Sequence, residues 1–309
     1  MLGIFILMYG GNFAMLVTLH SENYEVTINS LGAELKSFLT PDKKEFVWNS
    51  DPAFWMRSSP LLFPTIGNVR NNTTLFHGHP YPMPKHGFCK DSEFTVTKQT
   101  ADQAAFTLKS SADTLAFYPF SFELCLSYHL IGHTLEMTYS VTNTDSKDLP
   151  YHIGAHPGFM CPLNEGETLT DYQLVFEKEE DFRAVPYNLE QLCFSAGKQV
   201  SLCGHGTILP LTQKLFDNDA VFFPHINSRL VQLVHRNSNH GVEVAYPDFC
   251  SIAFWTPIGG KAPFLCIEPW NGSAIFDDED DEFITKRNVQ FLSPGESKDY
   301  HLRISLLEH

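Results

Sequence analysis

The sequence lacks the glycine-rich motifs by which several large enzyme classes are recognised. No Gly-x-Ser-x-Gly turn, Gly-Lys-Ser loop or Gly-x-Gly-x-x-Gly fingerprint occurs among its 309 residues. The first of these motifs places a serine nucleophile, the second cradles nucleotide phosphates and the third binds a dinucleotide. The sequence therefore gives no support to a serine hydrolase, a nucleoside triphosphatase or a dehydrogenase.

Paired cysteines are absent as well. None of the seven cysteines belongs to a Cys-x-x-Cys pair, so we do not expect a zinc site built from thiolates. An odd number at irregular spacing indicates free thiols in a reducing compartment, which predicts a cytoplasmic protein. The cysteines are Cys89, Cys125, Cys161, Cys193, Cys203, Cys250 and Cys266.

Positive charge is scarce. The chain has 21 Lys and Arg against 36 Asp and Glu, which gives a net charge of −15. Such a protein repels phosphate backbones, so we do not expect a nucleic-acid partner. Six acidic residues in a row, 277–282, predict a solvated loop. The run lacks the spaced carboxylates and central glycine of a calcium loop, so no metal is expected there.

No hydrophobic run is long enough to cross a membrane. Residues 1–17 are mostly apolar and contain no Lys or Arg, but Gly10-Gly11-Asn12 interrupts them. A signal peptide needs a basic start, and a spanning helix needs about 20 apolar residues. We interpret residues 1–14 as an extension, for which one explanation is a misassigned start. An edge strand or membrane-surface segment is the alternative.

Alternating apolar residues predict β-strands over most of the chain. Alternation over 122–130 and 135–141 flanks a Gly132 turn, and alternation over 231–235 and 242–246 flanks a second turn. Two further pairs are expected over 24–38 and 94–108. Only short helices are expected, at 51–56 and 189–194. These features predict an all-β sandwich or barrel, formed by a single domain over residues 15–309.

Three titratable residues are the best candidates for chemistry. Glu268 lies between an apolar run and Trp270, where burial would raise the pKa of a carboxyl group. His86 and His156 lie beside glycines at expected strand ends, and functional groups favour such loops. A zinc pair of His152 and His156 would require a helix, which the neighbouring prolines and glycines exclude.

Four further residues are candidates for ligand contacts. Arg57 and Arg70 lie in a Pro- and Gly-rich segment beside residues that we expect to be buried, where each needs a carboxylate or ligand hydroxyls. Trp255 and Trp270 lie beside polar turn residues. Their rings could pack against the C–H faces of a sugar, whereas most of the 26 Phe are expected to be core residues.

Several of these stretches, taken together and in order, resemble the aldose 1-epimerase (galactose mutarotase-like) superfamily, in particular its LacX-like branch. The resemblance spans residues 17–307. The matching segments are residues 59–67, 83–88, 91–94, 154–159, 216–220, 266–272 and 292–297.

The resemblance implies a galactose mutarotase-like β-supersandwich with few short helices, and an isomerase that interconverts the α and β anomers of an aldose without a cofactor. Glu268 would be the base that takes the proton of the C1 hydroxyl, and His156 would be the acid that protonates the ring oxygen. His86 would bind the ring oxygen or neighbouring hydroxyls. Asp219, or less readily Asp217, and Arg70 would bind the sugar.

The sequence also departs from the better-known mutarotases. Their arginine directly follows an asparagine, whereas this chain has Asn68-Val69-Arg70, which makes Arg57 a rival. Residues 269–272, Pro-Trp-Asn-Gly, also differ. A phosphorylated sugar would favour a basic cluster, and none is evident in the sequence.

The partner is thus expected to be a small sugar bound by a monomer or homodimer, with no membrane partner. A non-catalytic carbohydrate-binding or sugar-sensing protein on the same fold is the alternative. An acidic protein-interaction domain is a third, for which the two histidines and Glu268 would lie far apart.

Overall fold

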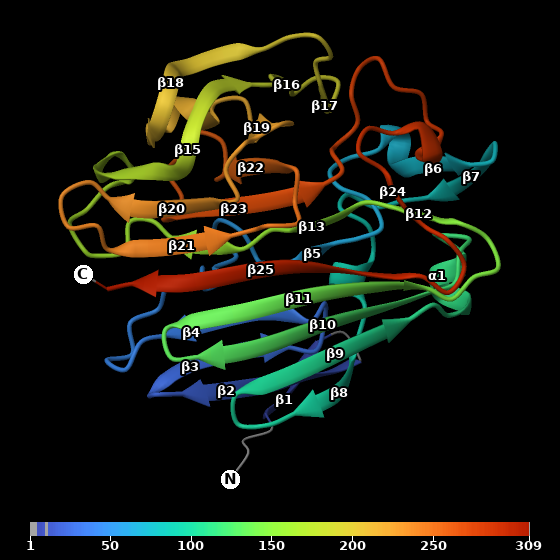
Figure 1. The fold of residues 1–309 in the computed structure, drawn as a ribbon, viewed down its shortest axis with the longest axis horizontal. Coiled ribbons are helices and arrows are strands. Elements are labelled where there is room, and N and C mark those ends of the chain that lie inside the picture. Colours follow the sequence, from blue (N-terminus) through green and yellow to red (C-terminus); the bar gives the residue numbers. More distant parts are fainter. Residues whose placement is uncertain (1–4, 10–11, 309) are drawn as a thin grey trace.

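Two layers of antiparallel β-sheet make up most of the protein. A computed structural model describes residues 5–9 and 12–308. A nine-stranded sheet crosses the whole molecule in Figure 1. Its strands, in spatial order, are β18 (Val200–Pro210), β15 (Tyr172–Ala184), β20 (Leu230–His235), β21 (Gly241–Ala245), β25 (Ser297–Leu307), β11 (Thr134–Asn143), β10 (Phe122–Ile131), β9 (Gln103–Lys109) and β8 (Thr95–Gln99).

Two smaller sheets lie behind this one in the view of Figure 1. The six-stranded sheet contains β19 (Val221–Phe223), β22 (Ser251–Trp255), β23 (Phe264–Asn271), β13 (Ile153–Ala155) and β5 (Leu61–Leu62), with β14 (Gly158–Met160) paired to β23. The four-stranded sheet contains β1 (Phe5–Tyr9), β2 (Asn12–Ser21), β3 (Tyr24–Asn29) and β4 (Glu34–Leu39).

The remaining elements are short. Three two-stranded ribbons pair β6 (Thr73–Phe76) with β7 (His79–Pro82), β12 (Leu149–Tyr151) with β24 (Gln290–Leu292), and β16 (Tyr187–Asn188) with β17 (Cys193–Phe194). The α-helix α1 spans Ala112–Leu115. Single 3₁₀ turns occupy Arg70–Asn72, Cys89–Asp91, Leu169–Asp171, Gln213–Phe216 and Phe283–Thr285. Within the described residues, none of the helices has the length and hydropathy that a membrane-spanning helix requires.

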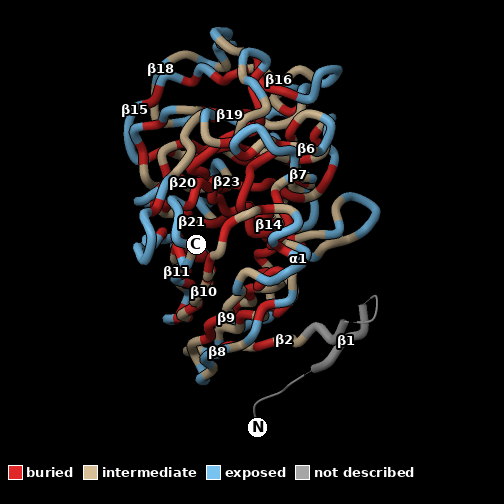
Figure 2. Tube along the Cα trace, turned by 90° about the vertical axis from the view of Figure 1, so that its right-hand side faces the viewer, coloured by how far each residue is buried: buried red, intermediate tan, exposed pale blue. Residues whose placement is uncertain are grey.

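The all-β prediction is confirmed, and the expected strand pairs are present. In β10 the buried and half-buried residues alternate strictly, because successive side chains of a strand point to opposite faces. The Gly132 turn joins β10 to β11 in register, with Ile131 opposite Thr134. Figure 2 shows the buried residues concentrated in the interior, where the core is rich in Phe and Tyr.

Both expected helices are wrong. Asp51 does accept the N–H of Ala53 through its carboxylate, as a helix cap would, but the chain makes only a turn there. Residues 189–192 form a turn between β16 and β17. The helix α1 is instead fixed by a capping box between Ser111 and Thr114.

The N-terminal extension proposed for residues 1–14 is described only in part. Phe5–Tyr9 forms the edge strand β1, which pairs with β2. Residues 1–4 and 10–11 lie outside the described part of the chain. The domain division at residue 15 remains an expectation.

Candidate active site

Strand β23 carries Glu268 to the floor of a cavity. The strand is buried on both faces, so its alternate side chains enter different environments. Leu265 and Ile267 belong to the main core. Glu268 and Trp270 line the cavity on the opposite face, and Glu268 is only 2% exposed. A central strand of the second sheet therefore presents a buried carboxyl group to the cavity, on the same face as Trp270.

His156 meets Glu268 from the bend between β13 and β14. Its Nε2 lies 3.1 Å from Oε2 of Glu268. The Trp55 ring lies over the imidazole with centroids 4.9 Å apart at 30°, and the Trp255 ring meets it edge-on at 5.7 Å. His156 is 6% exposed, and its Nδ1 is buried with no hydrogen-bond partner in the described structure. The contacts fix the ring with Nε2 toward the carboxyl group.

His86 faces His156 across the cavity, with ring centroids 5.6 Å apart and nearly perpendicular planes. It adopts a φ of 65°, in the left-handed region that few residues other than glycine enter. Two hydrogen bonds to Gly67 hold it there: the His86 N–H donates to the Gly67 carbonyl at 2.9 Å, and the Gly67 N–H donates to Nδ1 of His86 at 3.1 Å. Because Nδ1 accepts, the ring proton of neutral His86 lies on Nε2.

Burial dominates the electrostatics of these residues. It lowers the pKa of His156 to about 3 and the pKa of His86 well below its ordinary value. Burial also raises the pKa of Glu268 well above its ordinary value; the negative charge of Asp219 adds to this rise, and the positive charge of Lys85 opposes it. Near neutral pH one proton is therefore shared between Glu268 and His156, and burial favours its residence on Glu268.

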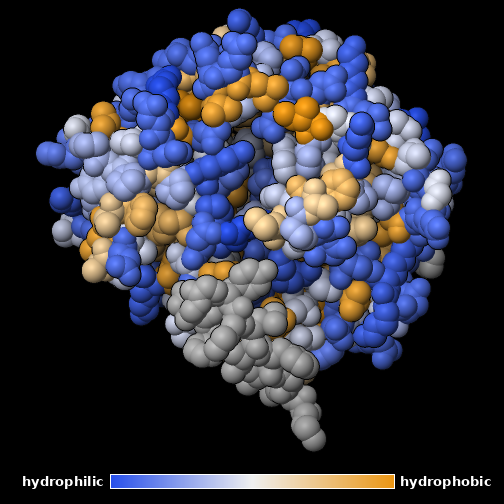
Figure 3. All heavy atoms as spheres, turned by 180° about the vertical axis from the view of Figure 1, so that it is seen from behind, coloured by the Kyte–Doolittle hydropathy of each residue, from blue (hydrophilic) through white to orange (hydrophobic). Residues whose placement is uncertain are grey.

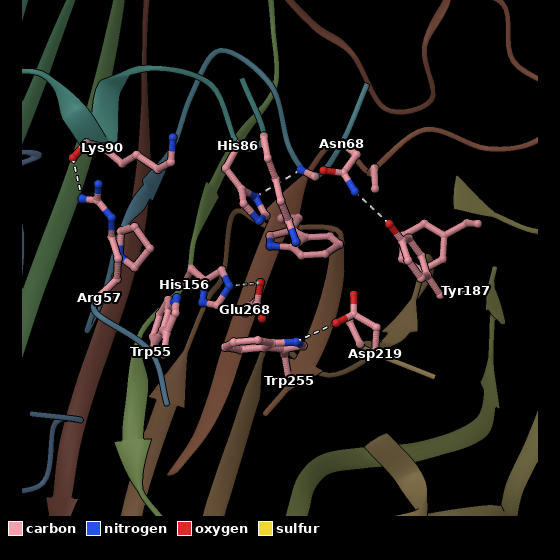
Figure 4. Close-up of a pocket in the computed structure, with 17 residues that line it drawn as sticks. Trp55, Arg57, Asn68, His86, Lys90, His156, Tyr187, Asp219, Trp255 and Glu268 are labelled. Atoms are coloured by element: carbon pink, nitrogen blue, oxygen red, sulfur yellow. Dashed lines mark hydrogen bonds and ion pairs between the residues drawn. The ribbon is translucent and has the colours of Figure 1, made fainter. Parts of the chain in front are cut away.

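The cavity has a volume of about 330 Å³, within the range of small-molecule sites. Figure 4 shows Glu268 and His156 at its centre, with Arg57 and Lys90 on one side and Asp219 and Tyr187 on the other. The residues lining it are Trp55, Arg57, Pro60, Gly67, Asn68, Lys85, His86, Lys90, His156, Tyr187, Phe194, Asp219, Ala220, Trp255, Glu268, Trp270 and Ala274.

The structure brings most of the predicted site residues together. The proximity of the two histidines to Glu268 argues against the interaction-domain alternative. Trp270 and Trp255 both line the cavity, and the Trp255 indole N–H donates to Oδ1 of Asp219 at 2.8 Å. Asp217, by contrast, is exposed and lies outside the cavity.

Of the two rival arginines, Arg57 lines the cavity and Arg70 does not. Arg70 donates to Asp281 and to the Phe276 carbonyl, both at 3.0 Å. Arg57, and not Arg70, is therefore placed where it could contact a ligand in this cavity. In the segment that contains Arg70, the cavity is lined by Gly67 and Asn68 instead.

Sequence reasoning missed ten of the cavity residues, and five of these offer polar groups or a large indole ring to a ligand. Asn68 donates through its side-chain amide to the Tyr187 hydroxyl at 3.0 Å. Trp55, Lys85 and Lys90 complete the set. Lys85 and Lys90 flank the motif that contains His86, which was the one local signal for them. Trp55 and Tyr187 come from turns and short ribbons whose position in space depends on the whole fold.

Two groups of side chains have the donor atoms that a transition metal prefers. His156, Cys266 and Glu268 place one ligand atom each within 4.8 Å of one another, as do Glu167, His235 and His240. In the first group, a metal would replace the proton shared by His156 and Glu268.

The comparisons with known proteins agree with this geometry. Residues 15–288 match the family model described as aldose 1-epimerase. Protein LacX (chromosomal) from Lactococcus lactis subsp. lactis is 31% identical over 299 residues, covering 95% of this chain and all of that protein.

Two solved structures are also similar. A galactose mutarotase-like protein from Lactobacillus casei has a TM-score of 0.87 at 30% identity and covers 94% of this chain and all of its own. A galactose mutarotase related enzyme from Lactobacillus acidophilus has a TM-score of 0.89 at 26% identity, over 95% of this chain and 98% of its own. The chain thus has the galactose mutarotase-like fold and belongs to the aldose 1-epimerase family.

Proposed function

We propose that this protein is an aldose 1-epimerase, which interconverts the α and β anomers of an aldose by acid/base ring opening. The observation that carries the proposal is the contact of Glu268 with His156 at 3.1 Å on the floor of a sugar-sized cavity. Ring opening needs one proton removed from O1 and one delivered to O5. A carboxyl–imidazole couple that holds a single proton can do both.

In the proposed reaction, the Glu268 carboxylate takes the proton from the O1 hydroxyl while the C1–O5 bond breaks. The imidazolium of His156 gives its proton to O5, which leaves an open-chain aldehyde. Rotation about C1–C2 and the reverse proton transfers then close the ring as the other anomer. His86, through Nε2–H, donates to the ring oxygen or a neighbouring hydroxyl and stabilises the charge that develops there.

These reaction steps start from the form of the couple in which the shared proton lies on His156. Burial, by contrast, favours the proton on Glu268. Three features favour the reactive form once sugar is bound. Sugar hydroxyls donate to the carboxylate, and the charge of Lys85 stabilises it. The Trp55 ring, whose face lies over His156, stabilises the imidazolium, because an aromatic face attracts a cation.

The proposal is tested by NMR measurement of anomer exchange on freshly dissolved glucose and galactose. We expect the wild type to accelerate exchange and Glu268→Gln to lower kcat by about 10²- to 10⁴-fold, the usual contribution of a general base. Glu179→Gln is the matched control, because Glu179 is exposed and lies outside the cavity.

Equal rates for the wild type and Glu268→Gln would overturn the role of Glu268. Calorimetry on the same sugars distinguishes the alternative of a non-catalytic carbohydrate-binding protein. Tight binding without exchange above the buffer rate across a panel of aldoses would support that alternative.

A further inference from the structure

Three cations line the cavity, although the protein as a whole is acidic. They are Arg57, Lys85 and Lys90, whereas the chain has only 21 Lys and Arg and a net charge of −15. They come from three positions along two loops that the fold brings together, which is why no basic cluster is evident in the sequence. A local concentration of positive charge against an opposite overall charge attracts an anion to that point.

Two of these cations are held in place by carboxylates. Asp91 lies between them and pairs with Arg57 on one side and with Nζ of Lys90, at 2.8 Å, on the other. Arg57 also contacts Glu34 at 3.5 Å and donates to the Lys90 carbonyl at 2.8 Å. This network fixes both side chains at the rim and leaves them partly exposed to the cavity.

Lys85 differs from the other two. It is an exposed residue, and no ion pair or hydrogen bond joins its side chain to another of the described residues. Its charge nevertheless affects Glu268, His86 and His156, because it opposes the rise in the pKa of Glu268 and contributes to the lowered pKa of each histidine. An unpaired ammonium group is thus placed within electrostatic range of the reacting groups.

The side of the cavity opposite Arg57 and Lys90 has a different character. Asp219, Asn68 and Tyr187 line it, and they offer a carboxylate, an amide and a hydroxyl. In Figure 4, Asp219 and Tyr187 lie on the side of the Glu268–His156 couple away from Arg57 and Lys90. A bound molecule would therefore meet neutral and acidic groups at one end, the proton-transfer couple in the middle and cations at the other end.

We propose that the cavity takes an aldose that carries an anionic substituent, a phosphate or a carboxylate, which binds at the cations that line the cavity, Arg57, Lys85 and Lys90. Lys85 supplies the charge that no protein group neutralises, and Arg57 and Lys90 supply further donors. The inference rests on the proposed function for the reaction, but the binding preference can be tested without any turnover.

The binding test uses ligands that cannot form an open chain. Calorimetry compares 1,5-anhydroglucitol, which lacks the anomeric hydroxyl, with its 6-phosphate and with a glucuronate analogue that likewise lacks it. We expect at least one anionic ligand to bind about tenfold more tightly than the neutral one at low salt, the effect of one charge-assisted contact. This preference should shrink in 0.5 M salt, because salt screens exposed charges.

Substitutions of single lysines test which residue causes the preference for the anionic ligand. Lys85→Gln should reduce the preference for the anionic ligand by about five- to tenfold. Lys147→Gln is the matched control, an exposed lysine outside the cavity, and should leave the preference unchanged. If the 6-phosphate binds more tightly, the anionic substituent of the substrate is a phosphate; if the glucuronate analogue does, it is a carboxylate.

Equal affinity for neutral and anionic ligands would overturn this inference even if glucose anomers are exchanged. An undiminished preference in Lys85→Gln would also overturn it. A preference that depends on Lys85, found in a protein that exchanges no anomers of any sugar, would support the anionic subsite and count against the proposed function alone.

Discussion

At the scale of single residues, the site depends on how the protein places one proton between two buried groups. Glu268 and His156 are both almost fully buried, and burial alone keeps the couple uncharged. The groups around them oppose each other: Asp219 disfavours the Glu268 carboxylate, while Lys85 favours it. Asp219 is therefore both a candidate for sugar contact and an electrostatic influence on the base.

Removing the charge of Asp219 should shift the pH dependence of the reaction. Asp219→Asn retains an oxygen that accepts the Trp255 N–H but removes the negative charge that raises the pKa of Glu268. The Glu268 carboxylate then forms at lower pH, so the acid limb of kcat/KM should move to lower pH. The measurement is anomer exchange by NMR across a pH series.

Asp217→Asn is the matched control, since Asp217 is exposed, lies two residues away and is outside the cavity. It should leave the acid limb in place. An acid limb that Asp219→Asn fails to move would show that Asp219 does not act on the base through its charge.

At the scale of elements, the site is assembled from loops that strands hold against one another. The segment after β5 and the segment after β7 are joined by the reciprocal hydrogen bonds of Gly67 and His86. Gly87 packs so closely on the first segment that an added Cβ would lie 2.1 Å from the Phe63 carbonyl oxygen. His86 can occupy its left-handed conformation because these contacts stabilise it.

Gly67→Ala should therefore reduce both stability and activity. Gly67 has a φ of 67°, and its Cβ would lie 2.2 Å from Cβ of Ala274, so the loop must move. The added strain and crowding should lower the free energy of unfolding by about 2 to 4 kcal/mol. His86 would lose its anchor, and anomer exchange should fall. Urea denaturation and the exchange assay measure the two effects.

Gly78→Ala is the control for crowding, because it adds a Cβ at a similar backbone conformation but without a close neighbour. Gly78 has a similar φ of 77°, but nothing lies within 4 Å of its Cβ position. The variant should lose only about 1 kcal/mol and retain full activity. Equal losses of stability in the two variants would show that Gly67 is needed for its conformation alone.

The elements also show what the sequence could predict. Strand pairs such as β10 and β11 were predictable because alternation and a glycine turn are local signals. Glu268, His86 and His156 were predictable because each lies in a short motif. The helix predicted at residues 51–56 is absent, because a capping residue indicates where a helix can begin but not how far it continues. Arg57, Lys85 and Lys90 could not be grouped in advance, since only the packing of separate loops brings them to one cavity.

At the scale of the whole molecule, the surface is mainly hydrophilic, whereas the interior holds histidines that affect the response to acid. Hydrophilic residues predominate on the face shown in Figure 3, with hydrophobic residues in separate patches. His152 and His156 are buried and His86 is half-buried, and desolvation lowers the pKa of each. The folded protein therefore keeps these rings neutral at a pH at which the unfolded chain protonates them.

His152 gives the clearest test of this effect, because it lies outside the cavity. It is fully buried beside Phe283, neither ring nitrogen has a hydrogen-bond partner in the described structure, and burial lowers its pKa to about 3. The unfolded chain binds a proton there below about pH 6.5, whereas the folded protein does so only near pH 3. The stability that His152 contributes is thus present above pH 6.5 and is lost as the pH falls toward 3.

His152→Leu should therefore make the protein less sensitive to acid. Below pH 6 the free energy of unfolding of the wild type should fall more steeply than that of the variant, by about 1.4 kcal/mol per pH unit, the slope for one proton. Glu268 acts in the opposite direction, since its raised pKa makes the folded state retain a proton, but it is present in both proteins and cancels in the difference.

Urea denaturation between pH 7.5 and 5 measures the slopes, with the exposed His225→Leu as control. Parallel slopes for the wild type and His152→Leu would mean that His152 is protonated in the folded protein, which would require an acceptor or a water channel at a position that the structure shows as fully buried.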